Sequence, residues 1–140
     1  MTSIKFKKLH KDAKPFAYSR EYDACMDMFA CEDVFIGPHS TKIIPTGISL
    51  EIPPGYEGLV RGRSGIASKG VQVHLGTIDE NYRGDVGVVM TNTNSFPYHA
   101  SKGARIAQFT IKPVIRIELA ETDTLTETER GINGYGSSGI

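Results

Sequence analysis

Several features that define common protein classes are scarce in this sequence. The chain has only two cysteines, Cys25 and Cys31, without a CxxC spacing, which argues against a disulfide scaffold and against a structural zinc site. We expect both thiols to be reduced and buried. The four histidines are scattered along the chain and form no HExxH motif or nucleophile-base pair. Zinc hydrolysis and acyl-enzyme chemistry are therefore poor candidates.

An excess of charge of one sign and long apolar runs are also missing. The 16 Lys and Arg residues balance the 16 Asp and Glu residues, so the formal net charge is +0. No global basic field is available to recruit nucleic acid, and any polyanion must be bound locally. No apolar run approaches the roughly 18 residues of a membrane span, and the first residues lack the apolar core of a signal peptide. We expect a cytoplasmic protein without membrane or direct nucleic-acid partners.

What the sequence does contain is a series of short strand patterns separated by turns rich in Gly, Pro and Asn. With 140 residues, of which 39% are hydrophobic, one compact domain is expected. The only helical signal is a possible turn near Ala67. This pattern predicts an all-β barrel or sandwich. Extended segments are expected at residues 4–9, 34–36, 41–44, 48–52, 56–61, 71–75, 86–90, 96–100, 105–111 and 114–119, with the first at a sheet edge and a polar turn at residues 91–95.

Two charged residues occur within apolar patterns. Asp27 interrupts an apolar run at residues 24–30, where an unpaired carboxylate would cost several kcal/mol if buried. Residues 105–111 alternate strictly, which places Arg105 on the same face as core residues such as Phe109. Arg105 is the natural partner for Asp27. The alternative is two unrelated, solvated charges at strand ends.

The segment from Gly76 to Asp85 is the most site-like turn in the chain, because it places a carboxylate, an aromatic ring and a cation between two strand patterns. Asp79 would lie at the rim of the sheet, where scaffolds commonly present functional side chains. Its glycines permit positive φ angles or the close approach of backbone to a ligand. An ordinary hairpin turn uses the same residue types for conformational reasons alone.

Residues 63–70 combine a cation, hydroxyl groups and glycines ahead of the next strand pattern. Exposed backbone N–H groups, especially in a helical turn from Ile66 onward, can bind phosphate oxygens, while Arg63 supplies a forked, charged donor. The spacing is not that of a P-loop. A polar loop without a ligand is the alternative.

From Glu121 the chain becomes polar and offers no core of its own, so we expect this tail to be mobile. It nevertheless carries useful chemistry, since Arg130 and the backbone near Ser137 and Ser138 suit phosphate groups. Tyr135 lies between two glycines and is free to pack over a flat ring. The alternative is a disordered end without function.

Five segments, in this order, resemble the five motifs of the trimeric dUTPase family: the run around Asp27, residues 63–65, 76–84 and 105–108, and residues 130–139. The resemblance implies a single-domain jelly-roll or β-barrel-like fold with a flexible C-terminal tail. Residues 1–120 would form the β-domain with motifs one to four, and residues 121–140 a mobile arm with motif five. It further implies a homotrimer with shared active sites. The reaction would be Mg²⁺-dependent hydrolysis of dUTP to dUMP and pyrophosphate, which limits uracil in DNA and supplies dUMP for dTTP synthesis.

The resemblance also assigns a role to each motif residue. Asp79 would be the general base that activates water for attack at the α-phosphorus, and Tyr82 would pack under the deoxyribose and disfavour UTP. Backbone groups near Val73 would read uracil. Mg²⁺ would bind the triphosphate and water, with no direct protein ligand. The resemblance assigns phosphate binding to Arg63, Ser64, Gly65 and Gln108. In the tail, Arg130, Ser137 and Ser138 would bind the γ-phosphate, and Tyr135 would stack on uracil. Asp27 and Arg105 would form a supporting ion pair.

The sequence departs from the family pattern in its first motif, where residues 24–28 read Ala-Cys-Met-Asp-Met instead of Ala-Gly-Tyr-Asp-Leu. Gly62 replaces the common proline before Arg63, and the ring of the tail belongs to tyrosine rather than phenylalanine. The deoxycytidine triphosphate deaminases of the same fold need a catalytic glutamate where this chain has Val89, so deamination is disfavoured. A regulatory role, in which a trimer of this type engages another protein, stays open as a second function.

Overall fold

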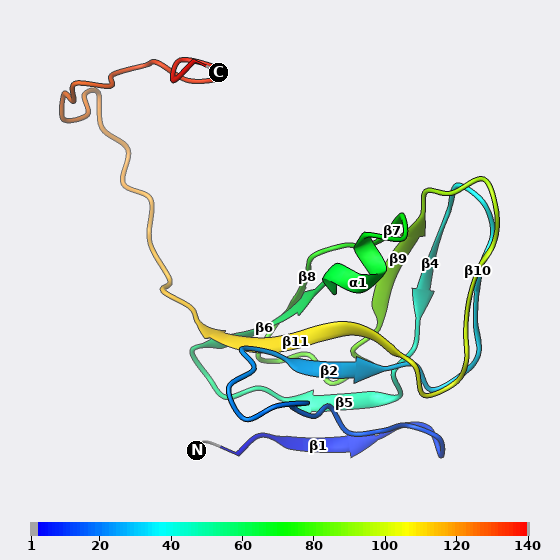
Figure 1. Ribbon diagram of the computed structural model, residues 1–140. Coiled ribbons are helices and arrows are strands. Elements are labelled where there is room, and N and C mark those ends of the chain that lie inside the picture. Colours follow the sequence, from blue (N-terminus) through cyan, green and yellow to red (C-terminus); the bar gives the residue numbers. More distant parts are fainter. Residues whose placement is uncertain (1–2, 140) are drawn as a thin grey trace.

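Short antiparallel strands build almost all of the regular structure (Figure 1). The computed structural model describes residues 3–139. The all-β prediction is confirmed, because the only helix in the described residues is a single turn. The elements are β1 (Lys5–Lys8), β2 (Met26–Phe29), β3 (Val34–Ile36), β4 (Ser40–Ile44), β5 (Ile48–Glu51), β6 (Tyr56–Arg61), α1 (Ser64–Ala67), β7 (Val71–Val73), β8 (Gly76–Ile78), β9 (Val88–Asn92), β10 (Tyr98–Ala100) and β11 (Arg105–Pro113).

The strands form a jelly-roll arrangement of small sheets that share one core. One sheet has the order β2-β11-β6-β8, and a second has the order β4-β9-β7. Two further pairs are β1 with β5 and β3 with β10. Figure 1 shows β1 and β5 at the bottom of the body and β10 at its right-hand edge. Every strand pairing within residues 3–139 is antiparallel. Because β1 pairs with β5 alone in that part of the chain, its expected edge position is confirmed.

The core is centred on Phe109 of β11, which is fully buried. Its ring packs against that of Phe16 at a centroid distance of 5.4 Å. A Cβ atom at Gly58 would lie 2.7 Å from the Phe109 ring, so glycine on β6 is what lets this aromatic side chain fill the space between strands. The result is a rigid platform made of β6 and β11.

The strict alternation predicted for residues 105–111 is wrong at its start. Ile106 and Ala107 are both fully buried, and the pairing of β11 with β2 shifts register between Arg105 and Ala107. Such a bulge places an extra residue on one strand and re-aims the side chains beside it. Arg105 is consequently exposed at the strand end instead of sharing the face of Phe109.

The strand predicted at residues 114–119 is also not formed. Beyond Val114, whose N–H donates to the carbonyl of Gly55 at 2.8 Å, this segment has no strand partner in the described chain. Ile115, Ile117 and Leu119 are 87%, 78% and 88% exposed. The alternating apolar residues are therefore present, but they pair with no strand within residues 3–139.

Two other boundaries differ from the predictions. The polar turn expected at residues 91–95 begins later, because β9 continues to Asn92. The Asn92 side chain is fully buried and donates to the carbonyls of Ile36, Gly37 and Phe96. The segment expected as one turn after Leu75 instead opens with β8, which pairs with β6. Asn92 can end a strand in the interior because its amide group finds backbone partners there, which explains why the polar turn begins later than expected.

The two cysteines behave differently from one another. Both are free thiols, but Cys31 is buried whereas Cys25 is half-buried, so the prediction of burial is wrong for Cys25. Burial raises the pKa of the Cys31 thiol, with a further contribution from the nearby carboxylate of Asp85. Among the described residues, no helix is long and apolar enough to cross a membrane.

Candidate active site

The most site-like feature is the segment of residues 79–87 between β8 and β9, called here the substrate turn. Its two flanking strands belong to different sheets, since β8 pairs with β6 and β9 pairs with β4 and β7. Asp79 directly follows β8 and is exposed. Together with parts of β4 and β8, the turn encloses an open pocket that is lined by Ile43, Thr77, Ile78, Asp79, Tyr82, Asp85 and Gly87.

Within this pocket, the position of the Tyr82 ring is fixed at both ends. The Tyr82 hydroxyl donates to the Asp85 carbonyl at 3.0 Å, and the Tyr82 N–H donates to the Asp79 carbonyl at 3.1 Å. A Cβ atom at Gly84 would approach the Tyr82 ring within 2.5 Å. Glycine at this position therefore allows the ring to fold back over its own turn, while the ring stays 43% exposed and open to a ligand.

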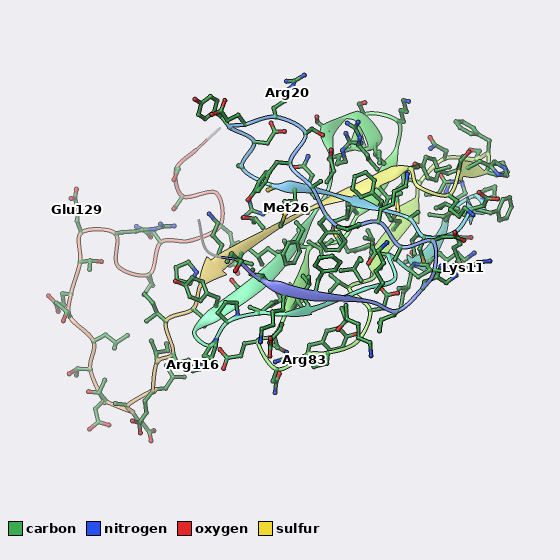
Figure 2. All side chains as sticks on the ribbon, turned by 90° about the horizontal axis from the view of Figure 1, so that it is seen from below. Lys11, Arg20, Met26, Arg83, Arg116 and Glu129 are labelled. Atoms are coloured by element: carbon green, nitrogen blue, oxygen red, sulfur yellow. The ribbon has the colours of Figure 1, made fainter. Side chains whose placement is uncertain are left out.

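A second acid in the turn, Glu80, connects it to the β5–β6 corner. Glu80 accepts from the Gly55 N–H at 2.5 Å and pairs with Arg116 at 3.0 Å. The Gly55 N–H, and then the Arg116 guanidinium, lower the pKa of the Glu80 carboxyl. Figure 2 shows Arg116 where the chain leaves the body, so this pair joins the residue beside Asp79 to the start of the C-terminal segment.

A separate cluster surrounds the carboxylate of Asp27 on β2. Its oxygens lie 3.2 Å from Arg63 Nε and 3.6 Å from Arg105 Nη1. The Ser19 hydroxyl donates to the same carboxylate at 2.5 Å. The structure thus brings Asp27 and Arg105 together, and it adds Arg63 and Ser19, which the sequence did not connect to them. We call these four residues the arginine cluster; two cations and a hydroxyl explain how this acid is buried on a strand.

The other residues of the second and fourth motifs lie next to the arginine cluster. Arg63 has extended backbone and precedes α1, which carries Ser64 and Gly65 on an exposed helical turn. Gln108 is half-buried on β11, opposite Asp27 of β2 and Arg61 of β6. These groups present a cation, a hydroxyl and an amide on one side of the molecule, which is a set of phosphate ligands.

Val73 lies apart from the pocket that contains Asp79. It pairs with Met90 on β9, and its side chain would lie 3.6 Å from a Cβ atom at Gly62. Val73 does not line the pocket of the substrate turn. Its assignment to uracil recognition stays a prediction. The sequence analysis gave no individual role to Ile43, Thr77 and Gly87, which also line this pocket. Gly87 could have been recognised, because it is a small residue just beyond the site-like segment of residues 76–85.

The two groups of residues are far apart within one chain. Ile78 pairs with Gly58 near the start of β6, and Arg63 lies just past its end. Residues along an extended chain advance about 3.3 Å each, so Asp79 and Arg63 are separated by roughly 20 Å. A base and the ligands of one phosphate chain must lie within hydrogen-bond reach of the same phosphates. One copy therefore does not bring Asp79 and Arg63, two residues with predicted roles, within reach of the same phosphates.

The C-terminal segment, residues 114–139, carries no helix or strand in the described chain and extends away from the body in Figures 1 and 2, as the labelled Glu129 shows. Arg130 contacts only its own segment, through Nε and the Asn133 carbonyl at 2.9 Å. Tyr135, Ser137 and Ser138 are exposed. We call this segment the arm. It meets neither the substrate turn nor the arginine cluster through any of the residues predicted to bind substrate.

Metal-binding groups are not concentrated anywhere in residues 3–139, which contain no cluster of three or more His, Cys, Asp or Glu side chains suited to a cation. Asp27 is committed to its two arginines and Ser19. A cation that acts at this site would therefore have to draw most of its ligands from a substrate and from water.

Comparison with known proteins places the chain in one family. The family model described as dUTPase matches residues 11–139. The deoxyuridine 5'-triphosphate nucleotidohydrolases of Gloeothece citriformis and Clostridium tetani are 41% and 42% identical, each covering 98% of this chain and 97% of its relative. The dUTPase of Staphylococcus bacteriophage 80alpha, solved with dUpNHpp, has a TM-score of 0.94 at 30% identity, with 100% of both chains covered.

A further solved structure, a mutant dUTPase of phage phi11 of S. aureus, has a TM-score of 0.83 at 25% identity over 88% of this chain and 98% of its own. That structure describes the coordination of a structural Mg(II) ion. The match to the family model extends from before the first motif to the end of the fifth, and the curated relatives cover nearly the full chain. The chain belongs to the dUTPase family.

Proposed function

We propose that this protein hydrolyses dUTP to dUMP and pyrophosphate. The observation that carries the proposal is the pocket of the substrate turn, in which an exposed carboxylate and a fixed aromatic ring line the same cavity. A carboxylate can accept a proton from water, and a ring can shape a sugar subsite. The curated relatives are named for this activity, which supports the same conclusion.

In the proposed mechanism, Asp79 orients a water molecule and takes its proton as the water attacks the α-phosphorus in line. Because Asp79 is exposed on a well-anchored turn, its carboxylate can reach a bound nucleotide without unfolding the sheet. The Tyr82 ring packs against C2′ of the deoxyribose, so that a 2′-hydroxyl has no space. Uracil is read by backbone groups, near Val73 as the family resemblance implies and also at Thr77 and Gly87, which line the same pocket as Asp79.

Arg63, Ser64, Gly65 and Gln108 bind the phosphate chain and stabilise the charge that develops on it. Because these groups lie roughly 20 Å from Asp79 along β6, they act on the nucleotide held by another copy of the chain. This separation supports a homotrimer in which each active site is shared between subunits. The exposed alternation of Ile115, Ile117 and Leu119 supports the same assembly, because it offers an unpaired apolar edge.

The arm completes the site in this proposal. Residues 1–120 act as the β-domain, and residues 121–140 as a mobile closing segment. Arg130, Ser137 and Ser138 bind the γ-phosphate, and Tyr135 stacks on uracil. Arg130, Tyr135, Ser137 and Ser138 do not line the pocket of their own chain, although Arg116 at the base of the arm pairs with Glu80. We therefore assign the end of each arm to the active site of another subunit.

Mg²⁺ fits this site through the substrate rather than through a protein cage. When bound to the triphosphate it would neutralise charge on the phosphate oxygens. Arg63 and Gln108 would hold the same phosphate chain from the protein side, and Asp27 keeps the guanidinium of Arg63 oriented toward it through their 3.2 Å contact. The physiological consequence of the reaction is less uracil in DNA and a supply of dUMP for dTTP synthesis.

A nucleotide panel tests the reaction. Pyrophosphate release should be strongest with dUTP and much weaker with dCTP, dTTP and UTP, all in the presence of Mg²⁺. Comparable turnover of UTP would contradict the role of Tyr82. Release of ammonia from dCTP would instead indicate the deaminase chemistry of the same fold, which the valine at position 89 disfavours.

Mixed trimers test the shared site. One variant carries Asp79→Asn, and the other is truncated before Arg130; each alone should be nearly inactive. After the two are unfolded and refolded together, some sites combine Asp79 from a truncated subunit with the arm of the other variant. Activity above that of both parents is expected. Verified mixed trimers without any gain would show that the arm acts only on its own chain.

A further inference from the structure

The substrate turn contains a third acid, Asp85, that the proposed chemistry does not use. Its Oδ1 accepts from the Thr46 N–H at 3.2 Å and from the Thr46 hydroxyl at 3.1 Å. Its Oδ2 accepts from the Gly47 N–H at 2.9 Å. None of the ion pairs found within residues 3–139 includes Asp85, so hydrogen bonds alone stabilise this half-buried charge.

The partners of Asp85 are among the most firmly held residues of the fold. Thr46 is fully buried, and its hydroxyl also lies 2.9 Å from the Val86 carbonyl. The Val86 N–H donates to the Ile48 carbonyl at 2.8 Å. A charged acceptor with several N–H and O–H donors forms strong, well-oriented hydrogen bonds. The backbone at Asp85 is consequently pinned to the segment that enters β5.

Asp85 also holds the Tyr82 ring in place, but through its backbone carbonyl and not through its carboxylate. Its backbone carbonyl accepts the hydrogen bond from the Tyr82 hydroxyl at 3.0 Å. A continuous path therefore runs from the buried Thr46 through the Asp85 carboxylate and carbonyl to the tip of the Tyr82 ring. The missing Cβ at Gly84 leaves the ring free to lie along this path.

We propose that Asp85 is a positioning residue for substrate discrimination: its carboxylate fixes the carbonyl that holds Tyr82 in the place where the ring excludes a 2′-hydroxyl. The inference rests on the proposed function of this pocket and deepens it. It differs from a general anchoring role, because it predicts an effect on the choice between dUTP and UTP. A merely structural anchor would change stability or turnover with both nucleotides alike.

The test compares kcat/KM for dUTP with kcat/KM for UTP in the full-length protein. Asp85→Asn keeps the size of the side chain but replaces one acceptor oxygen by a donor, which faces an N–H of Thr46 or Gly47. Tyr82→Phe keeps the ring and removes only its bond to the Asp85 carbonyl. Each variant should lower the dUTP to UTP ratio roughly fivefold or more, the size expected for loss of one hydrogen bond.

Asp85→Asn and Tyr82→Phe break the same chain of hydrogen bonds, so their effects on the dUTP to UTP ratio of kcat/KM should not multiply. The double variant is expected to show a ratio close to that of the more affected single variant. The matched control is Ser49→Ala, which removes another anchor of the same turn, the 2.7 Å bond from the Ser49 hydroxyl to the Arg83 carbonyl. That control should keep the wild-type ratio, whatever it does to the unfolding midpoint.

Three results would overturn the inference: an unchanged ratio in folded Asp85→Asn, fully multiplicative effects in the double variant, or an equal fall in Ser49→Ala. If Asp85→Asn does not fold, Tyr82→Phe decides, since an unchanged ratio there also breaks the proposed path. The wild-type protein separates this inference from the proposed function. Absence of dUTP hydrolysis in the wild type contradicts the function itself, whereas normal wild-type selectivity with unaffected variants contradicts only the role of Asp85.

Discussion

The substrate turn and the arm both carry groups suited to a nucleotide, yet the chain treats them in opposite ways. In the turn, Glu80, Tyr82 and Asp85 each bond to a backbone atom of the protein. In the arm, Tyr135 has no neighbour that orders it, and its ring is fully exposed. The difference shows that composition supplies chemical groups, whereas hydrogen bonds to a packed sheet supply their positions. One part of the site is preorganised, and the other needs a ligand or a partner.

The largest expected effect lies in the preorganised part. Asp79→Asn keeps the shape of the side chain but removes the base, so turnover of dUTP should fall by about two orders of magnitude or more. Binding of the non-hydrolysable analogue dUpNHpp should change little, because the pocket keeps its form. Steady-state kinetics and calorimetric titration measure the two quantities. Near-normal turnover would place the base elsewhere.

Removal of the arm should have the next largest effect. Truncation before Arg130 leaves the β-domain intact and should reduce turnover by about a hundredfold, since a closing segment both excludes water and orients the phosphates. The unfolding midpoint should stay unchanged, because Arg130 and Tyr135 contact no part of the body in the described chain. A large loss of thermal stability would show that the arm is part of the folded core.

A pair of glycines sharpens the contrast between the two regions. A Cβ at Gly84 would lie within 2.5 Å of the Tyr82 ring, whereas a Cβ at Gly134 would meet nothing within 4 Å. Gly84→Ala should therefore displace the tip of the Tyr82 ring and break its bond to the Asp85 carbonyl, which should destabilise the fold by about 1 kcal/mol, the usual net contribution of one hydrogen bond. Gly134→Ala should leave the free energy of unfolding unchanged. Chemical denaturation of both variants measures the difference.

The smallest predicted effect concerns acid pH. The pKa of Glu80 is lowered below its ordinary value of 4.5 by the Gly55 N–H and by Arg116, so its ionised form stabilises the fold at neutral pH. That contribution is present above the ordinary value and is lost as the pH falls through the lowered pKa. The advantage of wild type over Glu80→Gln should shrink in this acid range when unfolding midpoints are compared.

Glu51 is the control for this measurement. The exposed Lys5 ammonium lowers the pKa of Glu51 as well, but salt screens such a surface pair. Adding salt should therefore remove the effect of Glu51→Gln while most of the effect of Glu80→Gln persists. If salt reduced the effects of Glu80→Gln and Glu51→Gln equally, the Gly55 N–H would contribute little to the stabilisation of the ionised Glu80.

Much of the fold follows from local pattern. The turn after Pro53 and the apolar content of residues 56–61 predicted β6 at its observed bounds. The possible helical turn expected near Ala67 is observed slightly earlier, as α1. Such features are set by neighbours in sequence. The bulge near Arg105 was missed because it depends on how β11 meets β2, and this contact links residues that are far apart in the chain.

The candidate site was predictable to a similar extent. Residue types singled out the turn at residues 76–85, and the family resemblance assigned roles to Asp79 and Tyr82, which line one pocket. The sequence also suggested Arg105 as the partner of Asp27. It did not indicate that Arg63 would bind the same carboxylate, because a carboxylate can accept from several donors at once. The distance between the two halves of the site was not visible in the sequence. It depends on the register of β8 on β6, which no local pattern encodes.

The roughly 20 Å between Asp79 and Arg63 along β6 has a consequence for how activity arises in a cell. If sites are shared, a newly synthesised chain is inert until it meets other copies. At low abundance, the total rate of hydrolysis then rises more steeply than the amount of protein. Once all chains are assembled, the rate becomes proportional to that amount. Serial dilution followed by rapid assay would reveal this threshold, and the concentration at which specific activity halves would report the strength of subunit association.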